Sequence, residues 1–221
     1  MFALRYVSFG GLALALAVAG GCSSVSRGSL EAVRLAMHGE KVEPTAASVA
    51  ATPYFQLQVN APEGEAILVL AKAEHGKLGW YGTGNDIVFT RDGVVVKTVG
   101  LPANLDDSAF PSVDPFKAGL QRLSGPLDYT RRMDWSPGYR YGVVVQAHIE
   151  PKALEDVEIL GTVRHLRRFD EQLSVPGLGT RMTNRYWVDP TDGFIWKSRQ
   201  YIAPGVPLEL IQLQPYREDA S

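Results

Sequence analysis

The chain of 221 residues has a single cysteine and no excess of basic residues. One cysteine cannot form an internal disulfide, so stability must come from a hydrophobic core, for which 45% apolar residues suffice. The formal net charge is −2, whereas a surface that neutralises phosphates requires clustered lysine and arginine. We therefore expect no nucleic-acid partner.

The sequence also lacks the short motifs of common enzymes and metal sites. It has no Gly-x-Ser-x-Gly elbow, no His-Glu-x-x-His, no P-loop and no Cys-x-x-Cys. Residues 82–86 contain Gly-x-Gly, but a strand pattern follows, so a hairpin turn is the better interpretation. The histidines have no metal-ligand spacing (His38, His75, His148 and His165). We expect no catalytic residue, no cofactor and no metal.

A membrane-spanning apolar run is missing as well, and the N-terminus carries a shorter one. Arg5 precedes an apolar stretch over residues 7–19, which is below the about 20 apolar residues that a spanning helix needs. The stretch ends in small residues, as secretory signal peptides do. We interpret residues 1–21 as a cleaved signal peptide.

The cysteine lies where this signal would be cut. Residues 19–22 read Ala-Gly-Gly-Cys and resemble the bacterial lipobox, in which the cysteine thiol is acylated, although leucine is more usual at the position of Ala19. The serines that follow make residues 22–28 a polar tether, whereas a nucleophilic cysteine needs a base and a shaped pocket. The sequence predicts lipid attachment at Cys22; the alternative is an ordinary cleavage site with a chance cysteine nearby.

The predicted anchor indicates where the protein resides. Two or more acyl chains hold a protein stably at a membrane. Ser23 stands where lipoproteins retained at the inner membrane usually carry Asp. We therefore expect the periplasmic face of the outer membrane of a Gram-negative bacterium.

Residues 29–221 are predicted to form one β-rich domain with a helix at its front. Ser29 can cap a helix over 29–38, Gly39 ends it, and Leu30, Val33 and Met37 share one face. From residue 54 onward, apolar and polar residues alternate in about ten short segments separated by turns rich in Gly and Pro. Few connections are long enough for parallel crossovers, so an antiparallel meander is expected.

Three stretches of this domain carry more specific predictions. Arg-Asp-Gly at 91–93 is typical of a tight hairpin turn. Residues 101–124 show weak periodicity and are predicted as a long loop with one short helix. Residues 157–169 alternate throughout and are predicted as a single strand.

Three other groups of side chains could form a catalytic or ligand-binding site. Asp106, Asp107 and Asp134 would suit glycoside hydrolysis, which uses paired carboxylates, but adjacent acids in a loop are usually only solvated. The tryptophans could form a sugar-stacking platform, although core and cross-strand packing is their more frequent role in a β-rich fold (Trp80, Trp135, Trp187 and Trp196). The arginines of one cluster are predicted on a solvated strand face, with binding of an anionic glycan or lipid head group as the alternative (Arg164, Arg167 and Arg168).

Several segments together resemble one known family. They are LAMHG at 35–39, VLAKAEHGKLGWYGTGNDIVFTRDGVVVKTVGLP at 69–102, DWSPGYRYG at 134–142, VPGLGTRMTNRYWVDPTDGFIWKSRQYIAP at 175–204 and PLELIQLQP at 207–215. In their order and spacing these segments resemble the YjbF/GfcB lipoproteins of exopolysaccharide and group 4 capsule operons. Cys22 matches the family's lipid-bearing cysteine. The resemblance implies a large antiparallel sheet curled into a half-barrel around one N-terminal helix. It also implies work beside an outer-membrane β-barrel protein in polysaccharide secretion.

From this resemblance and the absent motifs we predict a non-enzymatic accessory lipoprotein for exopolysaccharide or capsule secretion or assembly. Its expected partners are the membrane, other polysaccharide-secretion proteins and, as a candidate ligand, the polysaccharide itself. Two alternatives stay open. One is a periplasmic lipid or lipoprotein carrier whose concave face accepts an acyl chain; an open hydrophobic groove would favour it. The other is a glycan-modifying enzyme that uses Asp106 or Asp134.

Overall fold

The computed structural model describes residues 42–136 and 138–217, which form one twelve-stranded antiparallel sheet with a few short helices. The strands are β1 (Gln56–Ala61), β2 (Gly64–Glu74), β3 (Lys77–Tyr81), β4 (Ile87–Arg91), β5 (Val94–Val99), β6 (Asn104–Ala109), β7 (Leu127–Ser136), β8 (Arg140–Ile159), β9 (Thr162–Val175), β10 (Thr180–Val188), β11 (Ile195–Ala203) and β12 (Val206–Gln214). The helices are α2 (Ala46–Ala50) and α3 (Pro115–Ala118), with 3₁₀ turns η1 (Leu120–Arg122) and η2 (Pro176–Leu178).

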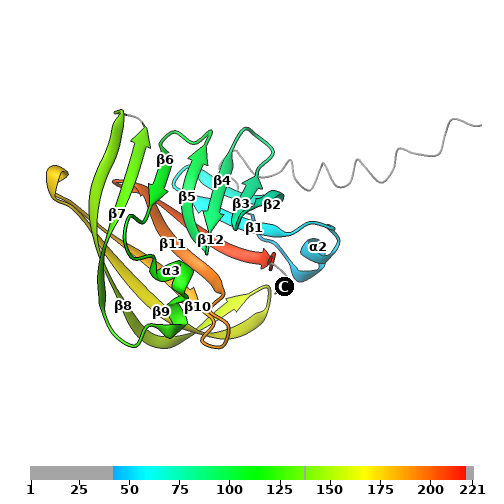
Figure 1. The fold of residues 1–221 in the computed structure, drawn as a ribbon. Coiled ribbons are helices and arrows are strands. Elements are labelled where there is room, and N and C mark those ends of the chain that lie inside the picture. The colour runs from blue at the N-terminus through cyan, green and yellow to red at the C-terminus, as the bar shows by residue number, and fades with distance from the viewer. Residues whose placement is uncertain (1–41, 137, 218–221) are drawn as a thin grey trace, which may run out of the picture. The chain divides into compact units, whose positions relative to one another are not determined.

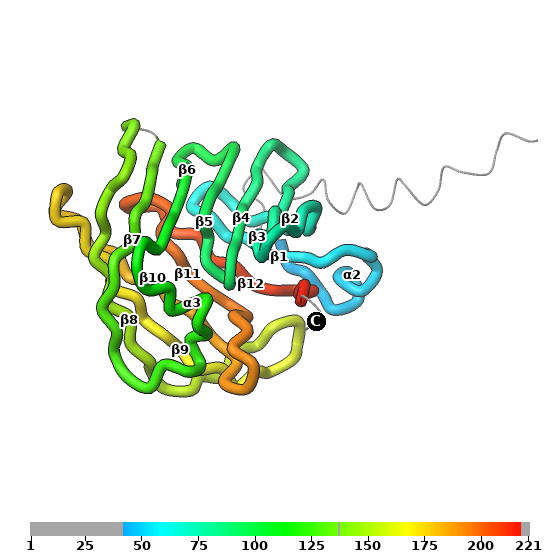
Figure 2. Tube along the Cα trace, in the orientation of Figure 1, coloured from blue at the N-terminus to red at the C-terminus, as the bar shows by residue number. Residues whose placement is uncertain are grey.

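The sheet curls until its two edge strands, β5 and β6, lie side by side (Figures 1 and 2). Consecutive strands pair from β1 to β5 and again from β6 to β12, and the ladder between β1 and β12 joins the two meanders. The mainly β, antiparallel meander was therefore predicted correctly. The sheet is a nearly closed barrel, however, and so closes further than the expected half-barrel.

Apolar side chains fill the interior of this barrel. Alternate residues of each strand point inward, as the burial pattern of β7 illustrates, because successive side chains of a strand face opposite sides. Trp80, Phe169 and Leu208 are fully buried in this core. The helix predicted over 29–38 lies outside the described residues, as does Cys22. None of the helices described has the length and apolar character needed to cross a membrane.

Two of the predicted segments differ from the structure. Residues 101–124 hold strand β6 as well as the short helix α3, and β6 was missed because its sequence, NLDDSA, is polar and buries only Leu105 and Ser108. The pattern over 157–169 is not one strand, because a hairpin turn at Leu160 and Gly161 lies inside it. Both turn residues have positive φ, 52° and 77°, and they connect β8 to β9.

Side chains rather than a backbone ladder close the seam between β5 and β6. At one end of the seam Leu105 donates its backbone N–H to the hydroxyl of Thr98 at 2.9 Å, and Asn104 bonds both backbone groups of Leu101. Further along, Lys97 reaches the carbonyl of Asp106 at 3.4 Å. An unpaired strand edge exposes backbone groups to wrong partners, and these contacts occupy part of it.

At the other end of β5 the side chain of Gln200, from β11, caps the strand edge. Its amide nitrogen donates to the carbonyl of Gly93 at 2.9 Å, and its amide oxygen accepts the backbone N–H of Val95 at 2.9 Å. One side-chain amide thus makes the two hydrogen bonds that a neighbouring strand would make. Gly93 also packs so closely on Ile195 of β11 that a Cβ there would lie 2.5 Å from that side chain.

Candidate functional site

A cavity of about 830 Å³ opens along β6 where β5 and β6 are no longer bridged. Its walls are the turn between β2 and β3, the turn between β4 and β5, strand β6, and the segment that leads into α3. The volume lies within the range of about 300–1,000 Å³ that ligand pockets occupy. This cavity is the candidate functional site.

Local sequence sets the two turns that form one wall. The pairs His75–Gly76 and Asp92–Gly93 each have positive φ at both residues (50° and 72°, 50° and 77°). Two-residue hairpins of this geometry favour glycine at the second position, as predicted for 91–93. Another wall is formed by the segment that leads into α3. Asp114 is the N-cap of this helix, and its carboxylate accepts hydrogen bonds from the backbone N–H groups of Phe116 and Lys117 at 3.0 and 3.1 Å.

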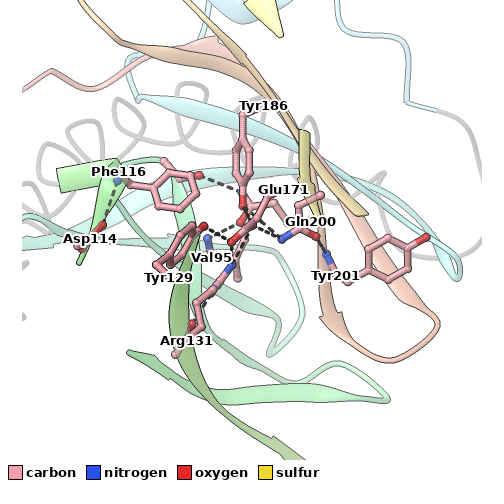
Figure 3. A network of polar contacts seen from close by, with 12 residues as sticks. Val95, Asp114, Phe116, Tyr129, Arg131, Glu171, Tyr186, Gln200 and Tyr201 are labelled. Carbon is pink, nitrogen blue, oxygen red and sulfur yellow. Dashed lines mark hydrogen bonds and ion pairs between the residues drawn. The ribbon is translucent and has the colours of Figure 1, made fainter. Parts of the chain in front are cut away.

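A buried polar network lies behind the cavity, centred on the carboxylate of Glu171 (Figure 3). Arg131 donates to both of its oxygens at 3.0 and 3.1 Å. Asn184 and the hydroxyl of Tyr186 each donate at 2.8 Å, and the hydroxyl of Tyr129 donates as well. The five residues are buried and come from β7, β9 and β10. Every acceptor direction of the carboxylate is thus used, which a buried charge requires.

Burial and charge together keep the two phenols and the guanidinium of this network protonated. Burial raises the pKa of the Tyr129 and Tyr186 hydroxyls, and the neighbouring carboxylate of Glu171 raises both further. For Arg131 burial alone would lower the pKa, but attraction to Glu171 outweighs it and the pKa is raised. Two neutral phenols therefore surround the ion pair between Arg131 and Glu171. The hydrogen bonds fix these side chains, and because all of them are buried, none is accessible to exchange a proton with solvent.

The network supports the wall of the cavity directly. Arg131 donates to the hydroxyl of Ser108 at 2.9 Å, and its guanidinium lies 5.1 Å from the ring centre of Phe110. Phe116 packs edge-on against Tyr186, with ring centres 4.9 Å apart. Ser108, Phe110 and Phe116 all line the cavity. The fixed ion pair therefore holds the cavity wall from inside the barrel.

The three candidate carboxylates lie on strands β6 and β7 and have different surroundings. Asp107 lines the cavity and is the cross-strand neighbour of Asp134. Asp134, however, accepts the backbone N–H of Gly142 at 2.6 Å, and Asp106 accepts the hydroxyl of Ser136 at 3.3 Å. Both carboxylates thus hold backbone or strand neighbours in place.

The tryptophans serve mainly in packing. Trp80 and Trp135 lie in the barrel core, and Trp80 donates to the hydroxyl of Thr90 at 2.9 Å. Trp196 belongs to a second apolar cluster with Ile159 and Leu166. The fourth, Trp187, is partly exposed and donates to Glu155 at 2.7 Å.

The predicted arginine cluster is already engaged by the protein. Arg168 pairs with Glu155 and Asp170, and Arg167 donates to the carbonyl of Lys152 at 3.3 Å. The guanidinium of Arg164 lies 3.5 Å from the ring centre of Trp196. These contacts favour the solvated strand face over an anion-binding cluster.

The histidines are spread over the sheet. His148 and His165 each pair with one aspartate, His75 lies at the cavity, and His38 is outside the described residues. Across 42–136 and 138–217 no group of His, Cys, Asp and Glu side chains could hold a metal ion.

Sequence reasoning missed the buried network, although a signal for it exists. The inward stripe of β7 reads Tyr129, Arg131, Met133, Trp135, and that of β9 includes Phe169, Glu171 and Leu173. Charges of opposite sign at inward positions of two apolar stripes indicate a buried ion pair. To use that signal one must know which side chains of each strand point inward. For β9 this could not be worked out, because the hairpin turn at 160–161 was read as part of a single strand.

Comparison with known proteins adds the family. Residues 13–213 match the family model described as group 4 capsule polysaccharide lipoprotein GfcB, YjbF. The chain belongs to this family. Within the YjbF/GfcB family, the uncharacterized lipoprotein GfcB of Escherichia coli K12 is 25% identical over 199 residues, which cover 88% of this chain and 92% of that protein.

One solved structure supports the fold. The crystal structure of the hypothetical lipoprotein YmcC from Escherichia coli K12 superposes with a TM-score of 0.71 at 24% identity, covering 79% of this chain and 90% of that one. An exported protein of Bacteroides fragilis with a YmcC-like fold matches with a TM-score of 0.34 at 11% identity, over 81% of this chain and 98% of that one. The family match over residues 13–213 confirms the resemblance to YjbF/GfcB lipoproteins that the sequence predicted.

Proposed function

We propose that this protein is a non-enzymatic lipoprotein of the outer membrane, anchored through Cys22 on the periplasmic face, that assists secretion or assembly of an exopolysaccharide or capsule. The observation that carries the proposal is the family match over residues 13–213. Its proposed partners are an outer-membrane β-barrel protein and other proteins of the same secretion system.

The buried carboxylate supports a non-enzymatic role. Glu171 is fully buried and does not line the cavity, so it cannot exchange a proton with a bound ligand. The cavity carboxylate of Asp107 has Asp134 as its cross-strand neighbour, and Asp134 is held by a backbone N–H. The side chains that fill the barrel core weigh against a carrier of acyl chains.

Deletion of the gene in the source bacterium tests the proposal. We expect less surface polysaccharide and less biofilm matrix, measured by sugar assay of washed cells and restored by the wild-type gene on a plasmid. The matched control is complementation with the Asp106→Asn, Asp134→Asn double variant, which should restore polysaccharide fully if no hydrolytic step depends on these acids. Normal polysaccharide in the deletion strain would contradict the proposed function. Failure of the double variant alone would favour the enzyme only where the variant accumulates to the wild-type level with an unchanged circular dichroism spectrum, because both carboxylates also hold strand neighbours in place.

A further inference from the structure

The cavity beside β6 combines an aromatic surface with hydrogen-bonding groups of both kinds. Phe110 and Phe116 form part of its wall, and the hydroxyls of Ser108 and Ser112 lie among them. The lining includes potential donors in the side chains of His75, Arg91 and Lys117, and carboxylate oxygens of Asp92, Asp107 and Asp114. A half-buried aromatic side chain in the wall together with hydrogen-bond donors and acceptors matches the apolar and the hydroxyl-bearing sides of a pyranose sugar.

The mixture of acidic and basic side chains in the cavity favours an uncharged ligand rich in hydroxyl groups over a charged one. Three carboxylates stand beside three basic groups, so a polyphosphate or a lipid head group would meet repulsion as well as attraction. An uncharged ligand with many hydroxyls can use both kinds of group, because a hydroxyl donates one hydrogen bond and accepts others.

Several of these side chains are available. Within the described part of the chain, Arg91, Asp107 and Lys117 are exposed and make no ion pair or side-chain hydrogen bond. Elsewhere on the described part of the sheet some charged side chains are matched, as Lys197 is with Glu209 at 3.0 Å, whereas others, such as Arg132 and Arg199, are not. Among the side chains that line the cavity, Arg91, Asp107 and Lys117 are thus exposed charged groups of both signs that are not paired with each other.

The wall behind these groups is rigid. The ion pair between Arg131 and Glu171 is buried on all sides, and Arg131 holds both Ser108 and Phe110. A surface that is already ordered loses little conformational entropy on binding, which raises affinity for a ligand that itself makes modest contacts.

We infer that this cavity binds a short, uncharged segment of a sugar chain, with Phe110 as the stacking surface and Arg91, Asp107 and Lys117 as groups that bond its hydroxyls. The inference rests on the proposed function, since it identifies the polysaccharide as a direct ligand of the cavity.

Titration of the purified full-length lipoprotein in detergent with oligosaccharides tests the inference. The probe is the exopolysaccharide of the source bacterium, cut to short oligosaccharides, with binding measured by calorimetry and by saturation-transfer NMR. We expect Asp107→Asn and Lys117→Ala each to weaken binding about tenfold, as loss of one or two hydrogen bonds to a ligand does. Arg199→Ala, an exposed arginine of β11 that does not line the cavity, should bind as the wild type does.

Three results would overturn the inference. They are no binding by the wild type, equal binding by the wild type and both cavity variants, and binding that vanishes when salt is raised to about 0.5 M, since only a charged ligand depends on unscreened attraction. Each is distinguishable from failure of the proposed function. If the deletion strain lacks polysaccharide but the cavity variants restore it and the protein binds no sugar, the accessory role stands and the sugar site does not.

Discussion

Glu171 and Arg131 form an ion pair from which water is excluded, and its energetics depend on the groups around it. Taking two charges out of water costs several kcal/mol each, and only good geometry with further hydrogen bonds offsets this cost. Here Asn184, Tyr129 and Tyr186 supply those bonds. We therefore expect the network to add little to the net free energy of folding. Its main effect is to specify how strands β7, β9 and β10 are placed relative to one another.

The two buried tyrosines predict a loss of stability at high pH. Their folded-state pKa values are raised above the value of about 10 that the unfolded chain has. The contribution of the two protonated phenols to the free energy of unfolding is fully present below about pH 10. It is lost as pH rises above about 10, because the unfolded state then releases protons that the folded state retains. The free energy of unfolding should fall by about 1.4 kcal/mol per pH unit for each tyrosine above pH 10.

Urea unfolding at a series of pH values measures this slope. The double variant Tyr129→Phe, Tyr186→Phe should have a shallower slope, whatever its stability at neutral pH. Tyr141→Phe is the control, since Tyr141 is 63% exposed. An unchanged slope in the double variant would show that these phenols do not titrate on unfolding.

At the scale of elements, the seam between β5 and β6 depends on single side chains. Gln200→Leu keeps the size of the side chain but leaves the Gly93 carbonyl and the Val95 N–H without their partner. We expect a loss of about 2–4 kcal/mol in the free energy of unfolding, because each unsatisfied buried group costs about 1–3 kcal/mol. The Val95 amide should also exchange with solvent faster.

Gln146→Leu is the matched control, because it is the same substitution at an exposed position of β8. Chemical denaturation measures the free energy of unfolding of the two variants, and hydrogen exchange measures the protection of the Val95 amide in each. If both variants lost the same stability and the Val95 amide stayed protected, Gln200 would not be the cap of β5.

The elements also show how far sequence reasoning reaches. Strands with alternating burial and glycine turns, such as the hairpin at 92–93, follow from local chemistry and were predicted. Strand β6 was not, because NLDDSA is polar and its place depends on β7 and on the side chains that bridge it to β5. The cavity was equally hidden, since its walls come from turns that are adjacent only after the sheet has curled, although Asp107 was among the candidates.

At the scale of the whole molecule, the predicted anchor and the barrel are separate parts of the sequence. Cys22→Ser should abolish incorporation of labelled palmitate and release the protein from the membrane fraction, because the thiol that receives the acyl chains is gone. The circular dichroism spectrum of the barrel should not change. Label that persists in the variant would place the anchor elsewhere.

The ladder between β1 and β12 has a consequence for folding. Every other pair of hydrogen-bonded strands consists of neighbours in sequence, which form early because the loop between them is short. Asn60 and Glu209 must meet across 149 residues, and closing so long a loop costs the most entropy of any pairing in the sheet. We therefore expect the two meanders to assemble first and the pairing of β1 with β12 to complete the barrel last.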